Sequence, residues 1–197
     1  MKQSIKIITS LLVILIITSC NSQTKNKIIN NELGFSFDFP KDIWYKSNKI
    51  KKNNYRKLLD SLSSKNEIRK KDFDLIYLFT KNKDERLLNP YVNILKINKG
   101  KGEFDFFKKK LPNHKKINIK KLDSKNISFD VNTIMVDEEN QIIGTLISSN
   151  GVFASSFYIF PKGNLIQFNF SESTGGKWKE NYISFKDKII NTIEYLE

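Results

Sequence analysis

The feature that most constrains the fold is a series of short strand-like segments in the second half of the chain. They are separated by DSKN, DEEN, SNG and PKGN, which contain the residue types that favour tight turns. Strands joined by such short connections pair antiparallel. We expect strands over residues 117–122, 128–136, 141–148, 152–160 and 165–170.

The first half of the chain adds further predicted strands. Leu33–Phe39 alternates with period two, and this places an apolar residue at every second position on one face. Pro40 ends this strand, and an extended path resumes at Ile43–Tyr45. Phe73–Thr80 is apolar enough for a mostly buried strand, and Tyr91–Ile97 alternates again.

Three segments have apolar residues at helical spacing: Asn54–Ser64, Gly102–Leu111 and Trp178–Leu196. Helices at the start, middle and end of the domain would cover the sheet. The predicted fold class is therefore α+β, an antiparallel sheet of about six to eight strands flanked by helices.

The amino terminus predicts an exported protein. Lys2 and Lys6 precede an apolar run from Ile7 to Ile17, which is too short for a bilayer core that needs roughly 20 apolar residues. A basic start, an apolar middle and small residues before the cleavage site are typical of a signal peptide. Ile17–Cys20 (ITSC) resembles the bacterial lipobox, whose Cys becomes lipidated; the alternative is a plain signal peptide with a chance Cys.

The predicted organisation follows from that motif. Residues 1–19 would be the lipoprotein signal peptide, 20–31 the lipidated Cys20 with a flexible tether, and 32–197 a single domain. The composition of the chain is similar to that of proteins from Bacteroidetes-like bacteria. In those bacteria, lipoproteins displayed on the outer face of the cell tend to have acidic residues just after the lipidated Cys. Residues 21–27 contain two lysines and no acid, and this predicts a domain that faces the periplasm.

The composition limits the partners. The chain has a net charge of +13, but of its 34 basic residues only Arg56, Arg69 and Arg86 are arginines. Arginine is the residue suited to bidentate phosphate recognition, so AT-rich codon usage explains the lysines better than a functional basic surface does. Because most aromatic residues fall on predicted core faces, we expect no nucleic acid partner. Cys20 is the sole cysteine, so no disulfide can form within the chain.

Two regions resemble the PsbP-like domains, a family named after an extrinsic protein of the oxygen-evolving complex. They are LGFSFDFPKDIWY at Leu33–Tyr45 and the carboxyl-terminal FYIFPKGNLIQFNF…NTIEY at Phe157–Tyr195. The resemblance implies the α-β-α sandwich that this family shares with the Mog proteins, and a role in binding or assembly without catalytic residues. Residues 46–71 look like an insertion relative to that pattern.

Candidate chemical sites are few. His114, the only histidine, is flanked by lysines, and a solvated position is the better interpretation. Asp137–Glu139 lacks the spacing of a calcium loop and is better explained as a solvated hairpin tip. Ser171–Trp178 contains Gly175-Gly176-Lys177 but lacks the first glycine of a phosphate-binding loop, so a glycine turn before a helix is favoured. We expect no metal site and no cofactor.

Three functions remain open. The first is a non-enzymatic binding or adaptor module of the bacterial envelope, anchored through Cys20 and bound to an unidentified envelope protein. The second is an envelope hydrolase whose carboxylate pair leaves no local signature in sequence. The third is a basic module that contacts anionic lipid or glycan through residues 46–71.

Overall fold

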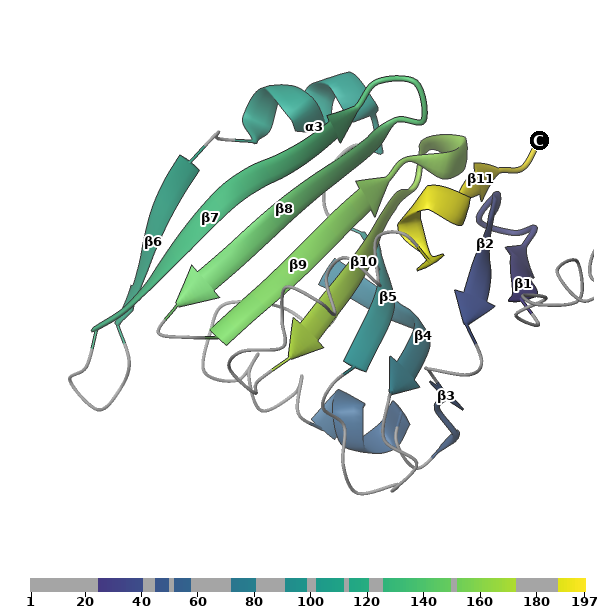
Figure 1. Cartoon of the computed structure of the whole chain (residues 1–197), viewed down its shortest axis with the longest axis horizontal. Coiled ribbons are helices and arrows are strands. Elements are labelled where there is room, and N and C mark those ends of the chain that lie inside the picture. The colour runs from purple at the N-terminus through teal and green to yellow at the C-terminus, as the bar shows by residue number, and fades with distance from the viewer. Residues whose placement is uncertain are drawn as a thin grey trace, which may run out of the picture.

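The computed structural model describes residues 25–40, 45–49, 52–57, 72–80, 91–98, 102–111, 114–120, 126–149, 152–172 and 188–197. These residues form two antiparallel sheets, one of eight strands and one of three. The large sheet has the order β3-β4-β5-β10-β9-β8-β7-β6, and the small sheet has the order β1-β2-β11. Figure 1 shows the small sheet beside the half of the large sheet that contains β4, β5 and β10.

The strands of the large sheet agree closely with the predicted segments. They are β3 (Tyr45–Lys46), β4 (Phe73–Thr80), β5 (Tyr91–Ile97), β6 (His114–Lys120), β7 (Asn126–Asp137), β8 (Ile142–Ser149), β9 (Val152–Ile159) and β10 (Leu165–Glu172). From β6 to β10 each strand pairs with the next along the chain, as short turns require. β10 then pairs with β5, so the series returns to the middle of the sheet.

The small sheet overturns the predicted fold class. β1 (Lys25–Asn30) and β11 (Glu194–Tyr195) pair with the two edges of β2 (Phe35–Pro40). A face of the large sheet is therefore covered by a second sheet, and the α+β prediction of a helix-flanked sandwich is wrong. The α-β-α sandwich implied by the resemblance to PsbP-like domains fails for the same reason.

Two predictions about single segments of the chain are also wrong. The flexible tether expected up to Asn31 is wrong for Lys25–Asn30, because these residues pair with β2 and Ile28 packs against the core. The predicted helix over 178–196 is wrong at its carboxyl end, where η3 (Ile190–Thr192) and β11 lie; residues 178–187 fall outside the described ranges. Glu194 and Tyr195 become a strand because the backbone edge of β2 supplies their hydrogen-bonding partner.

The main core lies between the two sheets and is rich in phenylalanine. The rings of Phe39 and Phe79 stack with centroids 4.3 Å apart, and those of Phe37 and Phe168 meet edge to face at 5.4 Å. Leu33, Phe35 and Phe37 are buried with them, so the alternation in the first predicted strand marks a real core face.

The helices are short and lie at opposite ends of the large sheet (Figure 1). The predicted helix at Gly102–Leu111 is confirmed as α3 (Phe104–Lys110), which packs Phe104, Phe107 and Leu111 against a second core cluster. At the other end, residues 52–57 are helical; the rest of the helix predicted over 54–64 lies outside the described ranges.

Candidate functional site

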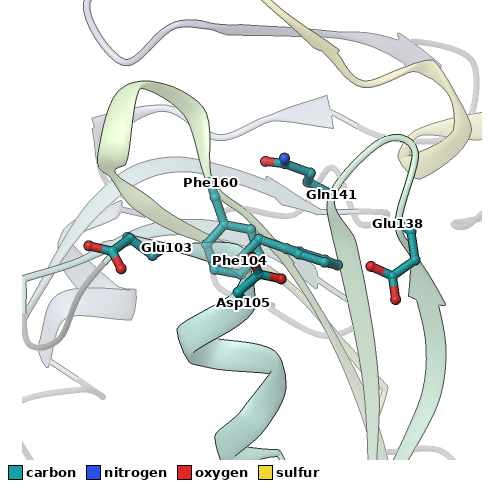
Figure 2. Close-up of a pocket in the computed structure, with 7 residues that line it drawn as sticks. Glu103, Phe104, Asp105, Glu138, Gln141 and Phe160 are labelled. Carbon is teal, nitrogen blue, oxygen red and sulfur yellow. The ribbon is translucent and has the colours of Figure 1, made fainter.

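A pocket of about 390 Å³ lies at the end of the large sheet where α3 begins. Figure 2 shows that its walls come from α3, from the β7–β8 turn and from the end of β9. β5 ends, β8 begins and β9 ends at this edge, and antiparallel pairing brings these strand ends together. The lining residues are Gly102, Glu103, Phe104, Asp105, Glu138, Gln141 and Phe160.

Two aromatic rings form the apolar floor of the pocket. Phe104 and Phe160 are both buried and meet edge to face, with ring centroids 5.7 Å apart. Phe107 packs against Phe160 from the next turn of α3, with centroids 5.6 Å apart. The apolar residues of α3 recur with the helical period of 3.6, and they therefore support the two rings that form the floor.

A backbone contact holds the start of α3 in place. A Cβ atom at Gly102 would lie 1.9 Å from the carbonyl oxygen of Gly163, so the two backbones pass too closely for any side chain at this position. Gly163 belongs to η2 (Pro161–Gly163), the turn that follows β9. This approach joins α3 to the loop that carries Phe160.

Three carboxylates form the rim. Glu103 and Asp105 extend from the start of α3, and Glu138 extends from the β7–β8 turn on the other side of the aromatic floor (Figure 2). All three side chains belong to exposed residues, and Glu138 forms an ion pair with Lys108. Gln141 adds a side-chain amide to the rim. The rim thus presents mainly oxygen acceptors, although the chain as a whole has a net charge of +13.

The carboxyl-terminal strand closes one side of this site. The hydroxyl of Tyr195 accepts a hydrogen bond from the backbone N–H of Phe160 at 3.2 Å and donates one to the carbonyl oxygen of Gln141 at 3.0 Å. Burial of this hydroxyl raises the pKa of Tyr195, and the negative charge of Asp137 adds to the increase. This shift favours the protonated phenol, which donates the second bond.

The acidic cluster predicted at Asp137–Glu139 is confirmed as the tip of the β7–β8 hairpin. Asn140 donates to Asp137 from its backbone N–H and from its side-chain amide, both at 2.9 Å, and these bonds lower the pKa of Asp137. Asp137 faces a second, smaller pocket of about 160 Å³, which is also lined by Ile190 and Asn191. The turn therefore contributes Glu138 to one pocket and Asp137 to another.

The residues that line the pocket include none of the other predicted site residues that the structure describes. Cys20 and Gly175–Trp178 lie outside the described residues. His114 lies in β6 opposite Asn132, three residues before the strand predicted at 117–122, and Ser171 lies in β10. Within the described ranges, no three His, Cys, Asp or Glu residues gather closely enough to hold a metal ion.

The sequence interpretation missed Glu103, Asp105, Gln141 and Phe160. A signal for the first two was present, since GEFD places acids on either side of the first buried residue of a helix. The other two come from separate turns and meet α3 only in the folded chain.

The chain matches no protein-family model and no curated protein. None of the helices in the described ranges has the length and hydrophobicity to cross a membrane.

Proposed function

We propose that this protein is a lipid-anchored module of the bacterial envelope that binds a cationic group of a partner protein in the pocket between α3 and the β7–β8 turn. The observation that carries the proposal is the acidic rim of Glu103, Asp105 and Glu138 around an apolar floor of Phe104 and Phe160. Lys108 of the chain itself makes both kinds of contact, because its ammonium group pairs with Glu138 and lies 5.9 Å from the centre of the Phe104 ring. Carboxylates attract an ammonium or guanidinium group, and aromatic rings favour both the cation and its apolar stem. A lysine or arginine side chain of a partner has this chemistry.

Binding fits the pocket better than hydrolysis. A carboxylic acid that donates a proton near neutral pH needs an apolar enclosure that keeps it protonated. Glu103, Asp105 and Glu138 are exposed, so the pocket does not give them such an enclosure. An exposed acidic rim suits recognition of a cation and does not supply the enclosed acid of a carboxylate pair.

The anchor rests on the lipobox-like ITSC at Ile17–Cys20. Diacylglyceryl and amide-linked acyl chains at Cys20 would supply more than one membrane signal, which stable anchoring requires. The acid-free residues after Cys20 favour a domain that faces the periplasm.

Cross-linking in cells that produce the native envelope tests the pocket. A photoreactive amino acid in place of Gln141 should capture a partner, and Glu103→Gln with Asp105→Asn should reduce that capture at least about tenfold, since each lost charge pair contributes about 1 kcal/mol or more when partly desolvated. Glu32→Gln with Asp74→Asn is the control, because it removes two exposed acids that do not line the pocket. Equal capture by both double variants would refute a role for the rim carboxylates.

A further inference from the structure

The described domain has two chemically different ends. β5 runs from Tyr91 at one end of the large sheet to Ile97 at the other, a span of roughly 20 Å. The pocket and its acidic rim lie at the Ile97 end. At the Tyr91 end, β4 terminates at Thr80 and pairs with β3, and the helix of residues 52–57 follows β3 along the chain.

The part of the Tyr91 end formed by β3 and the helix at 52–57 is strongly basic. Among the described residues of β3, of the bend after it and of the helix at 52–57, five are basic and none is acidic. We call this group the basic end; its members are Lys46, Lys49, Lys52, Arg56 and Lys57. All except the half-buried Lys52 are exposed. Their positive charge is therefore available to an external surface.

The short helix that carries part of the basic end is fixed to the sheet by Tyr55. The ring of Tyr55 is buried and meets Tyr91 edge to face, with centroids 5.4 Å apart. Its hydroxyl accepts a hydrogen bond of 2.6 Å from the side-chain amide of Asn93. Arg56 and Lys57 are exposed while Tyr55 points into the domain, so the helix presents its basic side chains outward.

That hydrogen bond belongs to a longer buried series across the sheet. Asn169 donates to Asn93 at 2.8 Å, and Ser156 donates to Asn169 at 2.6 Å. Four elements are thereby joined: the helix, β5, β10 and β9. A connected polar network of this kind fixes the helix at 52–57, with its Lys52, Arg56 and Lys57, to the sheet.

The amino terminus of the domain emerges at the same end. Lys25, the first residue of β1, pairs with Pro40 at the end of β2, and β3 begins only five residues after Pro40. The stacked rings of Phe39 and Phe79 place this end of β2 over the end of β4 that leads to Thr80. Lys25 is five residues after Cys20, and a chain of that length spans at most about 18 Å.

We infer that the basic end rests on a membrane surface of anionic phospholipid, which holds the acidic pocket on the side of the domain away from the bilayer. This inference rests on the proposed lipid anchor, since the anchor delivers the basic end to the head groups. Juxtamembrane lysines and arginines are attracted to anionic lipid, whereas the carboxylates near the pocket are repelled. The orientation leaves the pocket open to a partner in the aqueous compartment.

Fluorescence quenching at two positions tests this orientation. The protein is purified from membranes as the cell processes it, and its mass shows whether Cys20 is acylated. Because Cys20 is the sole cysteine, Asn53→Cys or Glu139→Cys then supplies the only free thiol for a fluorophore. Asn53 is exposed in the basic helix, and Glu139 is exposed at the β7–β8 turn. Each labelled protein is placed in vesicles that contain phosphatidylglycerol and a lipid with a nitroxide on its head group.

We expect the probe at position 53 to be quenched at least about threefold more than the probe at position 139. The difference should shrink in phosphatidylcholine vesicles and in about 1 M salt, where the Debye length falls to ~3 Å. Arg56→Glu with Lys57→Glu should abolish it. Lys109→Glu with Lys110→Glu, an equal charge change at two exposed residues of α3, should leave it intact.

The inference is overturned if the two probes are quenched equally in phosphatidylglycerol, or if both double variants have the same effect. Failure of the anchor is a separate outcome. An unacylated Cys20 would refute the proposed lipid anchor, and the same two probes in a Cys20→Ser background, with phosphatidylglycerol vesicles added from outside, would still show whether the basic end contacts lipid.

Discussion

The phenolic oxygen of Tyr195 lies 3.0 Å from the backbone carbonyl oxygen of Gln141, to which it donates a hydrogen bond. The two residues lie in different parts of the fold, since Tyr195 is in β11 of the small sheet and Gln141 lies in the turn before β8 of the large sheet. The same hydroxyl accepts from the backbone of Phe160, so a single side chain ties the carboxyl-terminal strand to two walls of the pocket.

We expect Tyr195→Phe to lower the free energy of unfolding by about 1 kcal/mol, because both backbone groups lose a partner while the ring is retained. Urea denaturation measures the change. Ile29→Thr serves as a control in β1 of the same small sheet, where the side chain is 55% exposed and its replacement should change stability by no more than about 0.5 kcal/mol. Equal effects of the two substitutions would contradict a specific role for the hydroxyl.

Two glycines at the pocket should respond very differently to alanine. A Cβ at Gly102 would lie 1.9 Å from the Gly163 carbonyl oxygen, so Gly102→Ala must separate α3 from η2 and should cost more than about 3 kcal/mol. Gly163→Ala meets open space and adds only the strain of a φ angle of +71°, about 1–2 kcal/mol. Thermal unfolding of both variants compares them, and a larger loss for Gly163→Ala would show that the close approach is absent.

The bond between Asn93 and Tyr55 should contribute measurably to the position of the helix at 52–57. Asn93→Leu leaves the Tyr55 hydroxyl and the Asn169 amide without this partner in a buried site, and we expect a loss of about 2–3 kcal/mol. Tyr55→Phe should cost about 1 kcal/mol, and the double variant should show a coupling of about 1 kcal/mol. Additive losses would mean that the two side chains do not interact.

Hydrogen exchange is an independent test of the hydrogen bond between Asn93 and Tyr55. Amides at 52–57 should exchange faster in Asn93→Leu than in the parent chain, while those of β7 should not change. Uniform acceleration across the domain would indicate general destabilisation and not release of the helix.

Stability should fall as the pH rises above about 10. Burial raises the pKa of Tyr55, of Tyr158 and of Tyr195 above the ordinary value near 10. Between the unfolded and folded pKa values the unfolded chain has lost its phenolic protons and the folded chain retains them, so unfolding becomes easier as pH increases. Below about pH 9 both states are protonated and these groups cause no pH dependence.

Urea midpoints measured from about pH 8 to pH 11 test this expectation. Lysines titrate in the same range, so the comparison is between the parent chain and Tyr55→Phe. The variant should lose stability less steeply with pH, because it lacks one of the raised phenols. Parallel curves for the two proteins would contradict the assignment.

The sequence predicted the large sheet well because its strands are local. Each of β7–β10 follows the previous strand through a short connection, and the turn residues and the apolar pattern both lie within a few positions. α3 was predictable for the same reason, since the apolar stripe of Phe104, Phe107 and Leu111 ends at Pro112.

The small sheet depends on distant partners. β1 is a mostly polar segment, KNKIIN, and β11 is two residues long; both become strands because the apolar β2 offers them two backbone edges. Ile189, Ile193 and Leu196 fit a helical stripe equally well, so periodicity alone gave the wrong element. The pocket escaped prediction because its walls, which include Asp105, Gln141 and Phe160, meet only in the folded chain.

The start of β1 sharpens what the lipid anchor predicts. With Lys25 already in the sheet, only Asn21–Thr24 separate Cys20 from the folded domain, fewer residues than the tether expected from sequence. Cys20→Ala should block lipidation and leave an uncleaved precursor, because it removes the thiol that we propose receives the diacylglyceryl group. Metabolic labelling with a radioactive fatty acid measures lipidation, and the mass of the product measures processing.

Ser19→Ala, which keeps a small residue before the Cys, is the control and should be lipidated normally. A labelled and normally processed Cys20→Ala protein would exclude Cys20 as the anchor. Protease added to intact cells completes the test, since a periplasm-facing domain should survive as long as a known periplasmic protein does.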